Sequence, residues 1–237
     1  MRNFVKLQPN SWLVRTTIRS LTRAASYFIQ VPGPRLLYNL AERIIEYPFV
    51  FSELKGHPVG KVLDVGCTDS KNVLPFMLAS LGWEVYGIDI QDFGFKHPNF
   101  HFVRGDITNT HFPDNFFNCV YSISTLEHIG IKGSFGIDRE DTDGDKKAMK
   151  EMARILEPKG TFLVTLPYGK PRVERSRRYD KLMLEELISG WRIDREAYCV
   201  FDNERGWVMT EKEVAEQAGH LRDEEKAIVL LKLSNSK

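Results

Sequence analysis

Short blocks of apolar residues alternate with longer amphipathic stretches along most of the chain. A short apolar block bounded by turn residues predicts a buried strand, and apolar residues repeated at the helical period predict a helix. The clearest helix covers residues 146–156, and the "EPKG" that follows is a helix-stop signal. The expected strands are 61–65, 84–88, 100–104, 119–123, 161–165, 191–200 and 226–233, and the other expected helices are 36–51, 73–81 and 181–190.

This alternation predicts an α/β fold: a doubly wound, Rossmann-like and mostly parallel sheet covered by helices, with right-handed crossovers. "VPGPR" (Val31–Arg35) and the later "KGHPVG" interrupt the pattern. We therefore expect an N-terminal helical extension over residues 1–55 and one domain over 56–237. Near the C-terminus, "FDNERGWVMTEKEVAEQAG" reads as a loop followed by a helix that Thr210 caps, with Glu213 completing a capping box.

The composition excludes several classes of protein. A hydrophobic content of 42% supplies an ordinary globular core, and a net charge of +1 gives no global reason to expect a nucleic-acid partner. No apolar run is long enough for a membrane span, and no secretory signal pattern is present. Three well-separated cysteines, Cys67, Cys119 and Cys199, indicate neither a metal site nor a disulfide framework. A reducing, cytoplasmic location is therefore the simplest expectation.

Positive charge nevertheless collects at the N-terminus. Residues 1–40 hold six arginines and lysines and no acid, and "WLVRTTIRSLTRAASYFI" spaces its arginines among apolar residues. One interpretation is an amphipathic helix that packs on the domain, or a partly disordered segment. The other is a helix that contacts a partner or lies at the periphery of an anionic membrane, because basic amphipathic helices suit such surfaces.

Acidic residues end three consecutive predicted strands. Asp64 closes the first strand in "VLDVGCTDS", where Gly66 permits a tight turn; Asp89 closes the second in "VYGIDI", and Asp106 follows the third in "RGDI". In a doubly wound sheet, ligands bind beyond the carboxyl ends of the strands. A carboxylate at Asp89 is placed to bind ribose hydroxyls, and one at Asp106 can meet an adenine amino group.

The first loop separates two classes of nucleotide-binding protein. A dinucleotide-binding enzyme needs GxGxxG so that a pyrophosphate can approach a helix N-terminus. Here Thr68 and Ser70 stand where further glycines are expected, and the carboxylate of Asp64 would repel a pyrophosphate. The loop therefore favours a nucleoside cofactor that carries positive charge.

The blocks "VLDVG", "VYGIDI", "RGDI", "FPDNFFNCVYSISTLEHIG" and "EMARILEPKGTFLVTLPYG" cover residues 60–170. In order and spacing they resemble class I S-adenosylmethionine-dependent methyltransferases, of the methyltransferase type 11-like kind. The resemblance implies a seven-stranded sheet whose last strand is antiparallel, and S-adenosyl-L-methionine as the cofactor. It also implies that the cofactor-binding residues are Asp64, Gly66, Cys67, Thr68, Ser70, Asp89, Ile90, Asp106, Ile107, Ser122, Ser124 and Glu127.

Two positions depart from the usual pattern of this family. The loop lacks the second and third glycines of D-x-G-x-G-x-G, and Asn118 stands where the fourth strand often carries an acid. The hydroxyls of Thr68 and Ser70 can donate to a carboxylate as the N–H groups of a glycine loop would. The "GCxxS" form of the loop also resembles a subgroup associated with surface-glycan synthesis. The alternative is a degenerate fold retained as a catalytically silent scaffold.

His128 in "STLEHIG" is the candidate catalytic residue. If the acceptor is a hydroxyl, a base should take its proton, and an unperturbed imidazole titrates near neutrality. The alternative is that His128 packs against the pocket or orients Glu127.

Two charged segments are candidates for binding the acceptor. The acidic stretch 138–145 does not fit the calcium-loop template, and we expect no metal there. Asp143 or Asp145 caps the following helix, or the acids bind sugar hydroxyls or assist His128. The basic stretch "LPYGKPRVERSRRYDKLML" is solvated or binds an anionic acceptor through arginine. The candidate substrate-binding residues are Asp138, Tyr168, Arg178 and Tyr179.

The sequence thus predicts a methyltransferase that O-methylates a sugar, a polysaccharide or another small-molecule acceptor, with glycan biosynthesis as its context. A silent scaffold and an RNA or protein methyltransferase are the alternatives. RNA is the weaker expectation because no second platform of basic and aromatic residues appears.

Overall fold

The computed structural model describes residues 33–68, 72–202, 205–220 and 226–235. The chain divides into two compact units, residues 1–44 and 45–237. The expected boundary between residues 55 and 56 stays a prediction, and the expected basic helix within residues 1–32 lies outside the described residues. The second unit carries the sheet and the site described below.

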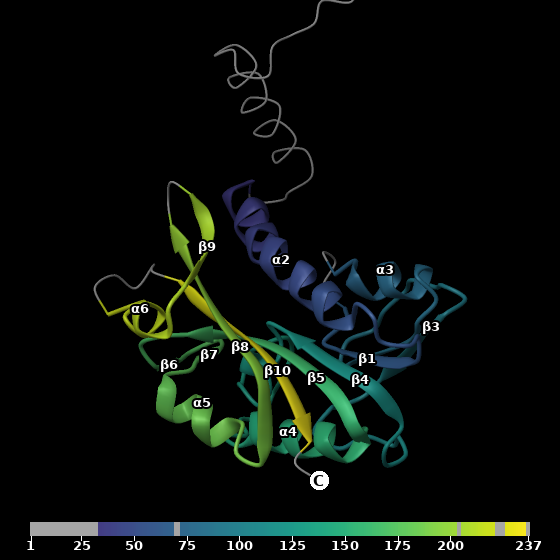
Figure 1. The fold of residues 1–237 in the computed structure, drawn as a ribbon. Coiled ribbons are helices and arrows are strands. Elements are labelled where there is room, and N and C mark those ends of the chain that lie inside the picture. The colour runs from purple at the N-terminus through teal and green to yellow at the C-terminus, as the bar shows by residue number, and fades with distance from the viewer. Residues whose placement is uncertain (1–32, 69–71, 203–204, 221–225, 236–237) are drawn as a thin grey trace, which may run out of the picture. The chain divides into compact units, whose positions relative to one another are not determined.

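Eight strands form one mixed sheet in the described part of the chain: β1 (Lys61–Val65), β2 (Glu84–Asp89), β3 (Phe100–Arg104), β4 (Phe117–Ile123), β5 (Leu156–Tyr168), β8 (Trp191–Asp202), β9 (Gly206–Thr210) and β10 (Ala227–Asn235). Their order across the sheet is β3-β2-β1-β4-β5-β10-β8-β9 (Figure 1). The first five in this order run parallel, and β10 is antiparallel to both of its neighbours. This arrangement confirms the mostly parallel, Rossmann-like α/β fold and the antiparallel last strand.

Helix α2 (Gly33–Leu54) precedes the first strand, and the strands are connected by α3 (Leu74–Ser80), α4 (Gly144–Ile155), α5 (Lys181–Leu187) and α6 (Lys212–Glu216). A short 3-10 helix, η1 (Leu126–His128), follows β4, and a small hairpin of β6 (Arg172–Val173) and β7 (Arg177–Arg178) follows β5. Every predicted strand and helix in the described residues overlaps one of these elements. None of the helices that the structure describes has the length and apolar character that spanning a bilayer requires.

The central strands β1, β4 and β5 are largely buried on both faces, and successive side chains of a strand point to opposite sides of the sheet. On β5, Phe162 and Val164 join a core formed with α4 and α5, whereas Leu163 between them joins a second core that includes α3. Figure 1 shows α4 and α5 on one side of the sheet and α3 on the other. Strands buried on both faces read as continuous apolar runs, which explains why the sequence pattern located them.

The structure corrects the prediction at the C-terminal edge of the sheet. The stretch predicted as a loop contains β9, which pairs antiparallel with β8, so the sheet has eight strands in the described residues and not seven. Thr210 ends this strand and does not cap a helix; α6 begins at Lys212 with Glu211 at its N-cap position. The "WVM" of β9 was an apolar signal, but a short edge strand flanked by turn residues resembles a loop in the sequence.

Candidate functional site

The carboxyl ends of β1, β2 and β4 meet at one edge of the sheet because the three strands run parallel and in register. We call these ends and the loops that follow them the nucleotide edge. The chain turns there at Gly66, whose φ is +83° and whose N–H donates to the Ile88 carbonyl at 2.9 Å. A Cβ atom at Gly66 would overlap the side chain of Thr125. Glycine therefore lets the loop after β1 pass close to the loop after β4.

Asp89 is the centre of the hydrogen bonds at this edge. Its Oδ2 accepts from the Thr68 N–H at 3.1 Å and from the Thr68 hydroxyl at 2.7 Å, and its Oδ1 accepts from the Gln91 N–H at 2.9 Å. A carboxylate offers about four lone-pair sites, so half-buried Asp89 retains capacity for another donor. The Thr68 hydroxyl, which the sequence suggested for a cofactor carboxylate, donates to this carboxylate of the protein.

Two further predicted residues, Asp64 near the end of β1 and Cys67 in the loop that follows, turn their side chains into the protein. Asp64 is 1% exposed, and its Oδ2 accepts from Asn72 Nδ2 at 2.8 Å. The Cys67 side chain is buried against Gly87, and burial raises the pKa of its thiol far above the usual range. Asp64 therefore stabilises the loop through its hydrogen bond to Asn72, and of Cys67 only the backbone can face a ligand at the nucleotide edge. Ser70 lies outside the described residues.

The predicted residues after β2 and β3 are divided between surface and core. Asp106 is exposed, and its Oδ1 accepts from the N–H and the hydroxyl of Thr108, both at 2.8 Å, which shapes the turn that follows β3. Ile90 is 38% exposed, whereas Ile107 is buried in the core that includes α4. Asp106 and Ile90 therefore remain accessible to a ligand, and Ile107 is turned inward.

Asn118, the departure from the family pattern on the fourth strand, lies away from the nucleotide edge. It stands at the start of β4, where its Oδ1 accepts from the Lys61 N–H at 2.7 Å and its Nδ2 donates to Glu157 Oε1 at 2.8 Å. These contacts fasten the amino ends of neighbouring strands. The absent acid therefore leaves the nucleotide edge unchanged.

The end of β4 contributes Ser122, Ser124 and Glu127. Ser122 is fully buried, and within the described residues its hydroxyl has no hydrogen-bond partner. Ser124 turns the chain with a φ of +47°, and Glu127 in η1 is 3% exposed. The three residues lie at or just after the carboxyl end of β4. The strand order reverses between β1 and β4, and ligands of doubly wound folds bind at such a reversal.

Glu46 is a site residue that the sequence reasoning missed. It projects from α2, is fully buried, and its Oε1 accepts from the Ser124 hydroxyl and from the Thr165 hydroxyl, both at 2.6 Å. On the same helix, the Tyr47 hydroxyl donates to Asn72 Oδ1 at 3.4 Å. An acid inside the apolar pattern "IIEYPF" was the available signal, because buried acids need specific partners.

His128 ends η1 with its side chain 26% exposed. Nδ1 lies 2.9 Å from the Arg175 carbonyl oxygen and 3.0 Å from the Ser134 hydroxyl, and the ring meets Phe135 edge-on. A carbonyl can only accept, so we assign the proton of the neutral ring to Nδ1. Nε2 is then the basic nitrogen, 3.9 Å from Glu127 Oε1.

The surroundings of His128 favour its neutral form. Burial lowers the pKa of the imidazole below 6.5 and the positive charge of Arg177 lowers it further, while the hydrogen bond to the Arg175 carbonyl acts in the opposite direction. At neutral pH the ring is therefore unprotonated at Nε2, which is the form that a general base requires.

Among the predicted substrate-binding residues, the structure pairs Tyr168 with Tyr179 through an isolated β-bridge, whereas Asp138 lies on a separate loop. The Tyr168 and Tyr179 rings are buried, and their hydroxyls donate to Glu216 at 3.2 Å and to Asp145 at 2.8 Å. Arg178 is 9% exposed beside Gly219, and Asp138 is exposed on the loop before α4. Basic and aromatic residues alternate in a way that suggests a binding platform, but the backbone turns both phenols into the core.

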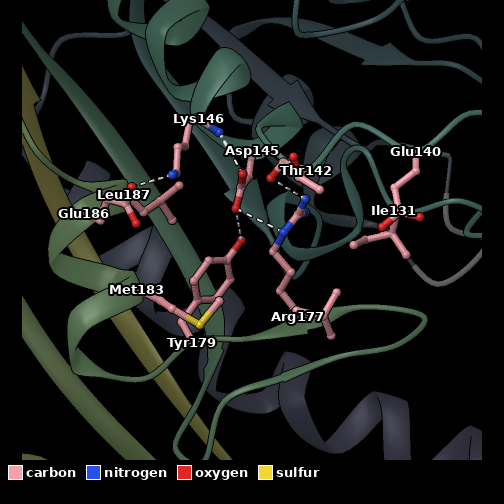
Figure 2. A pocket seen from close by; sticks show the side chains of 11 residues that line it. Ile131, Glu140, Thr142, Asp145, Lys146, Arg177, Tyr179, Met183, Glu186 and Leu187 are labelled. Carbon is pink, nitrogen blue, oxygen red and sulfur yellow. Dashed lines mark hydrogen bonds and ion pairs between the residues drawn. The ribbon is translucent and has the colours of Figure 1, made fainter.

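A buried ion pair occupies the space that the acidic and basic segments share. Arg177 Nε lies 3.4 Å from Asp145 Oδ2, with both side chains 5% exposed. The sequence left Asp143 or Asp145 to cap α4; Asp143 occupies the N-cap position without a side-chain bond, and Asp145 binds Arg177 and Tyr179. Asp145, Arg177 and Tyr179 line a cavity of about 180 Å³, and Figure 2 shows how their side chains lie. The wall is completed by Ile131, Glu140, Thr142, Lys146, Val173, Met183, Glu186 and Leu187.

Comparison with known proteins identifies the part of the chain that carries the nucleotide edge. Residues 63–164 match the family model described as a methyltransferase domain. The sterol 24-C-methyltransferase erg6 of Aspergillus fumigatus is 27% identical, over 77% of this chain and 55% of that protein. The chain thus spans about half the length of this curated relative.

Solved structures share the fold. The 1,6-didemethyltoxoflavin-N1-methyltransferase of Burkholderia thailandensis is similar with a TM-score of 0.56 at 12% identity, over 99% of this chain and 94% of that one. The [4+2]-cyclase SpnF is similar with a TM-score of 0.54 at 15% identity, over 82% of this chain and 80% of that one. At such identities the likeness shows the fold alone.

Proposed function

Residues 63–164 of this chain are a class I S-adenosylmethionine-dependent methyltransferase domain, and we propose that the protein transfers a methyl group to a hydroxyl of a sugar or another small molecule. The observation that carries the proposal is the nucleotide edge. There a tight glycine turn, a half-buried carboxylate and an imidazole with a basic Nε2 follow three parallel strands of one sheet.

The residues at the nucleotide edge fit this cofactor. Asp89 would bind the ribose hydroxyls, because its carboxylate has lone pairs beyond those that Thr68 and Gln91 use. Gly66 would let the backbone approach the ligand, and the carboxylates of Asp64 and Asp89 favour a positive charge over a pyrophosphate. When bound, S-adenosylmethionine supplies an electrophilic methyl group on a sulfonium.

His128 would act as the general base. Its Nε2 would take the proton of the acceptor hydroxyl, since its Nδ1–H is engaged by the Arg175 carbonyl. The edge-on contact with Phe135 and the bond to Ser134 limit rotation of the ring. A fixed base of this kind reduces the cost of bringing the proton acceptor into place.

Two observations bear on the class of the acceptor, and each favours a different one. The "GCxxS" loop resembles methyltransferases associated with surface-glycan synthesis, which favours a sugar hydroxyl and glycan biosynthesis as the context. A carbon acceptor is the second candidate, because erg6 is by name a C-methyltransferase and a base can remove a proton from carbon as well. We extend the proposal to a cytoplasmic location because all three cysteines are free thiols.

Binding of S-adenosylhomocysteine, measured by isothermal titration calorimetry, tests the donor half of the proposal. Asp89→Ala should weaken binding by about 1.5–3 kcal/mol, the range for a hydrogen bond to a charged group, or about 10- to 150-fold. Asp92→Ala is the matched control, because this exposed acid of the same loop pairs with Arg104 at 2.9 Å and should leave the affinity unchanged. A folded protein that does not bind the nucleoside refutes the proposal.

The base is tested separately by turnover. His128→Ala should lower kcat by about 100-fold or more with little change in affinity for S-adenosylhomocysteine. Mass spectrometry of candidate sugars, phenols and carbon acceptors would identify the substrate by the gain of one methyl group. Binding without any methylation would favour another role for the fold, which SpnF illustrates as a [4+2]-cyclase.

A further inference from the structure

The β6–β7 hairpin carries the carbonyl that holds His128. Its strands are two residues each, paired as Arg172↔Arg178 and Val173↔Arg177, and Arg175 lies in the turn between them. An isolated two-stranded hairpin is marginally stable at best in water. The position of the Arg175 carbonyl, and with it that of the imidazole, therefore depends on what fastens the hairpin to the rest of the protein.

Arg177 fastens the hairpin to the segment that follows His128. Its NH1 donates to the Ile129 carbonyl at 2.6 Å, and its NH2 donates to the carbonyls of Asp141 and Thr142 at 3.4 Å and 3.3 Å. Ile129 is the residue directly after His128. One guanidinium thus joins the hairpin, the peptide after the base and the end of the loop that leads into α4.

The acceptor groups around Arg177 are also held by contacts that do not involve the guanidinium. The φ of Gly130 is +79°, and a Cβ atom there would overlap the Asp141 carbonyl, so the loop after η1 closes tightly on itself. The Asp141 N–H also donates to the Gly130 carbonyl at 2.9 Å. On the other side, Asp145 is held by the Tyr179 hydroxyl at 2.8 Å and by the Lys146 N–H at 2.9 Å. Figure 2 shows the Arg177 guanidinium pointing toward Asp145 and Thr142.

We propose that Arg177 is the positioning residue for His128: it clamps the hairpin onto the segment after η1, so that the Arg175 carbonyl keeps the ring in the tautomer with a basic Nε2. The inference rests on the proposed function, in which this nitrogen takes the acceptor's proton. Lysine cannot replace arginine here, because one ammonium lacks the fork that reaches carbonyls and a carboxylate together.

The groups around the imidazole determine in which direction the pKa of His128 should change when Arg177 is replaced. The titratable groups that face it are Glu127 on its own helix and Arg177 on the hairpin; the other contacts are the Arg175 carbonyl, the Ser134 hydroxyl and the Phe135 ring. Loss of the guanidinium removes a positive charge and exposes the ring, and both changes raise the pKa of His128, whereas release of the Arg175 carbonyl lowers it. Burial is the largest of the three effects, so the net change expected is a rise. A purely structural arginine elsewhere would change neither the pKa nor the tautomer of this ring.

The experiment is an NMR titration of the histidines of the full chain without any methyl donor or acceptor, with the His128 signals assigned by His128→Gln. In the wild type we expect the Nδ1–H tautomer and a titration midpoint below 6.5. In Arg177→Gln the midpoint should rise and the tautomers should mix, and in Arg177→Lys the rise should be smaller because the charge remains. Arg192→Gln is the control, since Arg192 is exposed at the amino end of β8 and pairs with Asp194.

Folding is checked by circular dichroism. Arg177→Gln leaves Asp145 buried without its cation, so the double variant Arg177→Gln/Asp145→Asn is measured beside it. An unchanged midpoint and tautomer in whichever of the three Arg177 variants folds overturns the inference. Because the titration needs no turnover, it separates this inference from the proposed function. If methylation is found, Arg177→Lys should also lower kcat by about 10- to 100-fold without changing the affinity for S-adenosylhomocysteine.

Discussion

Replacement of Glu46 probes how residues 45–54 of α2, the part of this helix in the second unit, are attached to the sheet. The carboxylate is fully buried, and Oε1 accepts from the Ser124 and Thr165 hydroxyls at 2.6 Å. Glu46→Gln keeps an oxygen acceptor of nearly the same shape but removes the charge. Glu46→Ala removes the acceptor, leaves the buried hydroxyls without it and opens a cavity.

The magnitudes follow from the type of hydrogen bond. A hydrogen bond to a charged group contributes about 1.5–3 kcal/mol and a neutral one about 0.5–1.5 kcal/mol. Two such bonds lose about 2–3 kcal/mol together when the acceptor becomes neutral, and part of this is offset because the carboxylate no longer has to be desolvated. We expect Glu46→Gln to lower the free energy of unfolding by about 1–2 kcal/mol and Glu46→Ala by about 3–5 kcal/mol.

Urea unfolding followed by circular dichroism measures both effects. Glu185→Ala on α5 is the surface control and should stay within about 0.5 kcal/mol of the wild type. A double-mutant cycle of Glu46→Gln with Thr165→Val should show a coupling of about 0.5–3 kcal/mol, because the two side chains are in contact. A loss below about 1 kcal/mol in Glu46→Ala, or an additive cycle, would show that this carboxylate does not hold residues 45–54 of α2 on the sheet.

Three further outcomes test other parts of the structure. Gly66→Ala should lower the free energy of unfolding by about 2–4 kcal/mol, because it combines a steric overlap with a positive φ. Gly56 has a similar φ of +85° but open space around it, so Gly56→Ala should lower the free energy of unfolding by only about 1 kcal/mol. Thermal unfolding measures both variants. Because burial lowers the pKa of His128, kcat/KM should stay flat above pH 6.5 and fall as the pH drops through the lower folded-state value; an acid limb above 6.5 would contradict this. Burial also lowers the pKa of Lys226 from 10.5 to about 8. Between these two pH values the unfolded chain binds one proton more than the folded chain, so the free energy of unfolding should rise with pH. Urea unfolding at a series of pH values should show this rise in the wild type and not in Lys226→Met.

The parallel half of the fold could be predicted because its central strands β1, β4 and β5 are largely buried on both faces. β1 and β3 begin and end at the predicted residues, since each is a short, mainly apolar run between turn signals. The edge strand β9 was missed because it is short and partly exposed, so its pattern is close to that of a loop. Burial sharpens a sequence pattern, and exposure at an edge weakens it.

The residues around the candidate site divide in the same way. Asp89 could be placed from sequence because its role depends on the strand that it ends, which is a local property. Glu46 could not, because its partners Ser124 and Thr165 lie 78 and 119 residues away. Tyr179 was assigned to the substrate because it stands among arginines, yet its partner Asp145 is 34 residues away and draws the phenol into the core. Local spacing thus identifies residues that end strands and misses those that join distant segments.

This division separates the two halves of the proposed reaction. Gly66, Asp89 and His128, which would bind the donor and take the proton, lie inside the matched residues 63–164. Glu46, Arg175 and Arg177, which hold the end of β4 and the imidazole, lie outside that match and come from α2 and from the hairpin after β5. Relatives that share the methyltransferase domain therefore carry information about the donor, and the acceptor has to be found by screening this chain itself. Variants at Glu46 and Arg177 should accordingly alter turnover and acceptor preference more than the affinity for S-adenosylhomocysteine; equal losses in both would place these residues in the donor half.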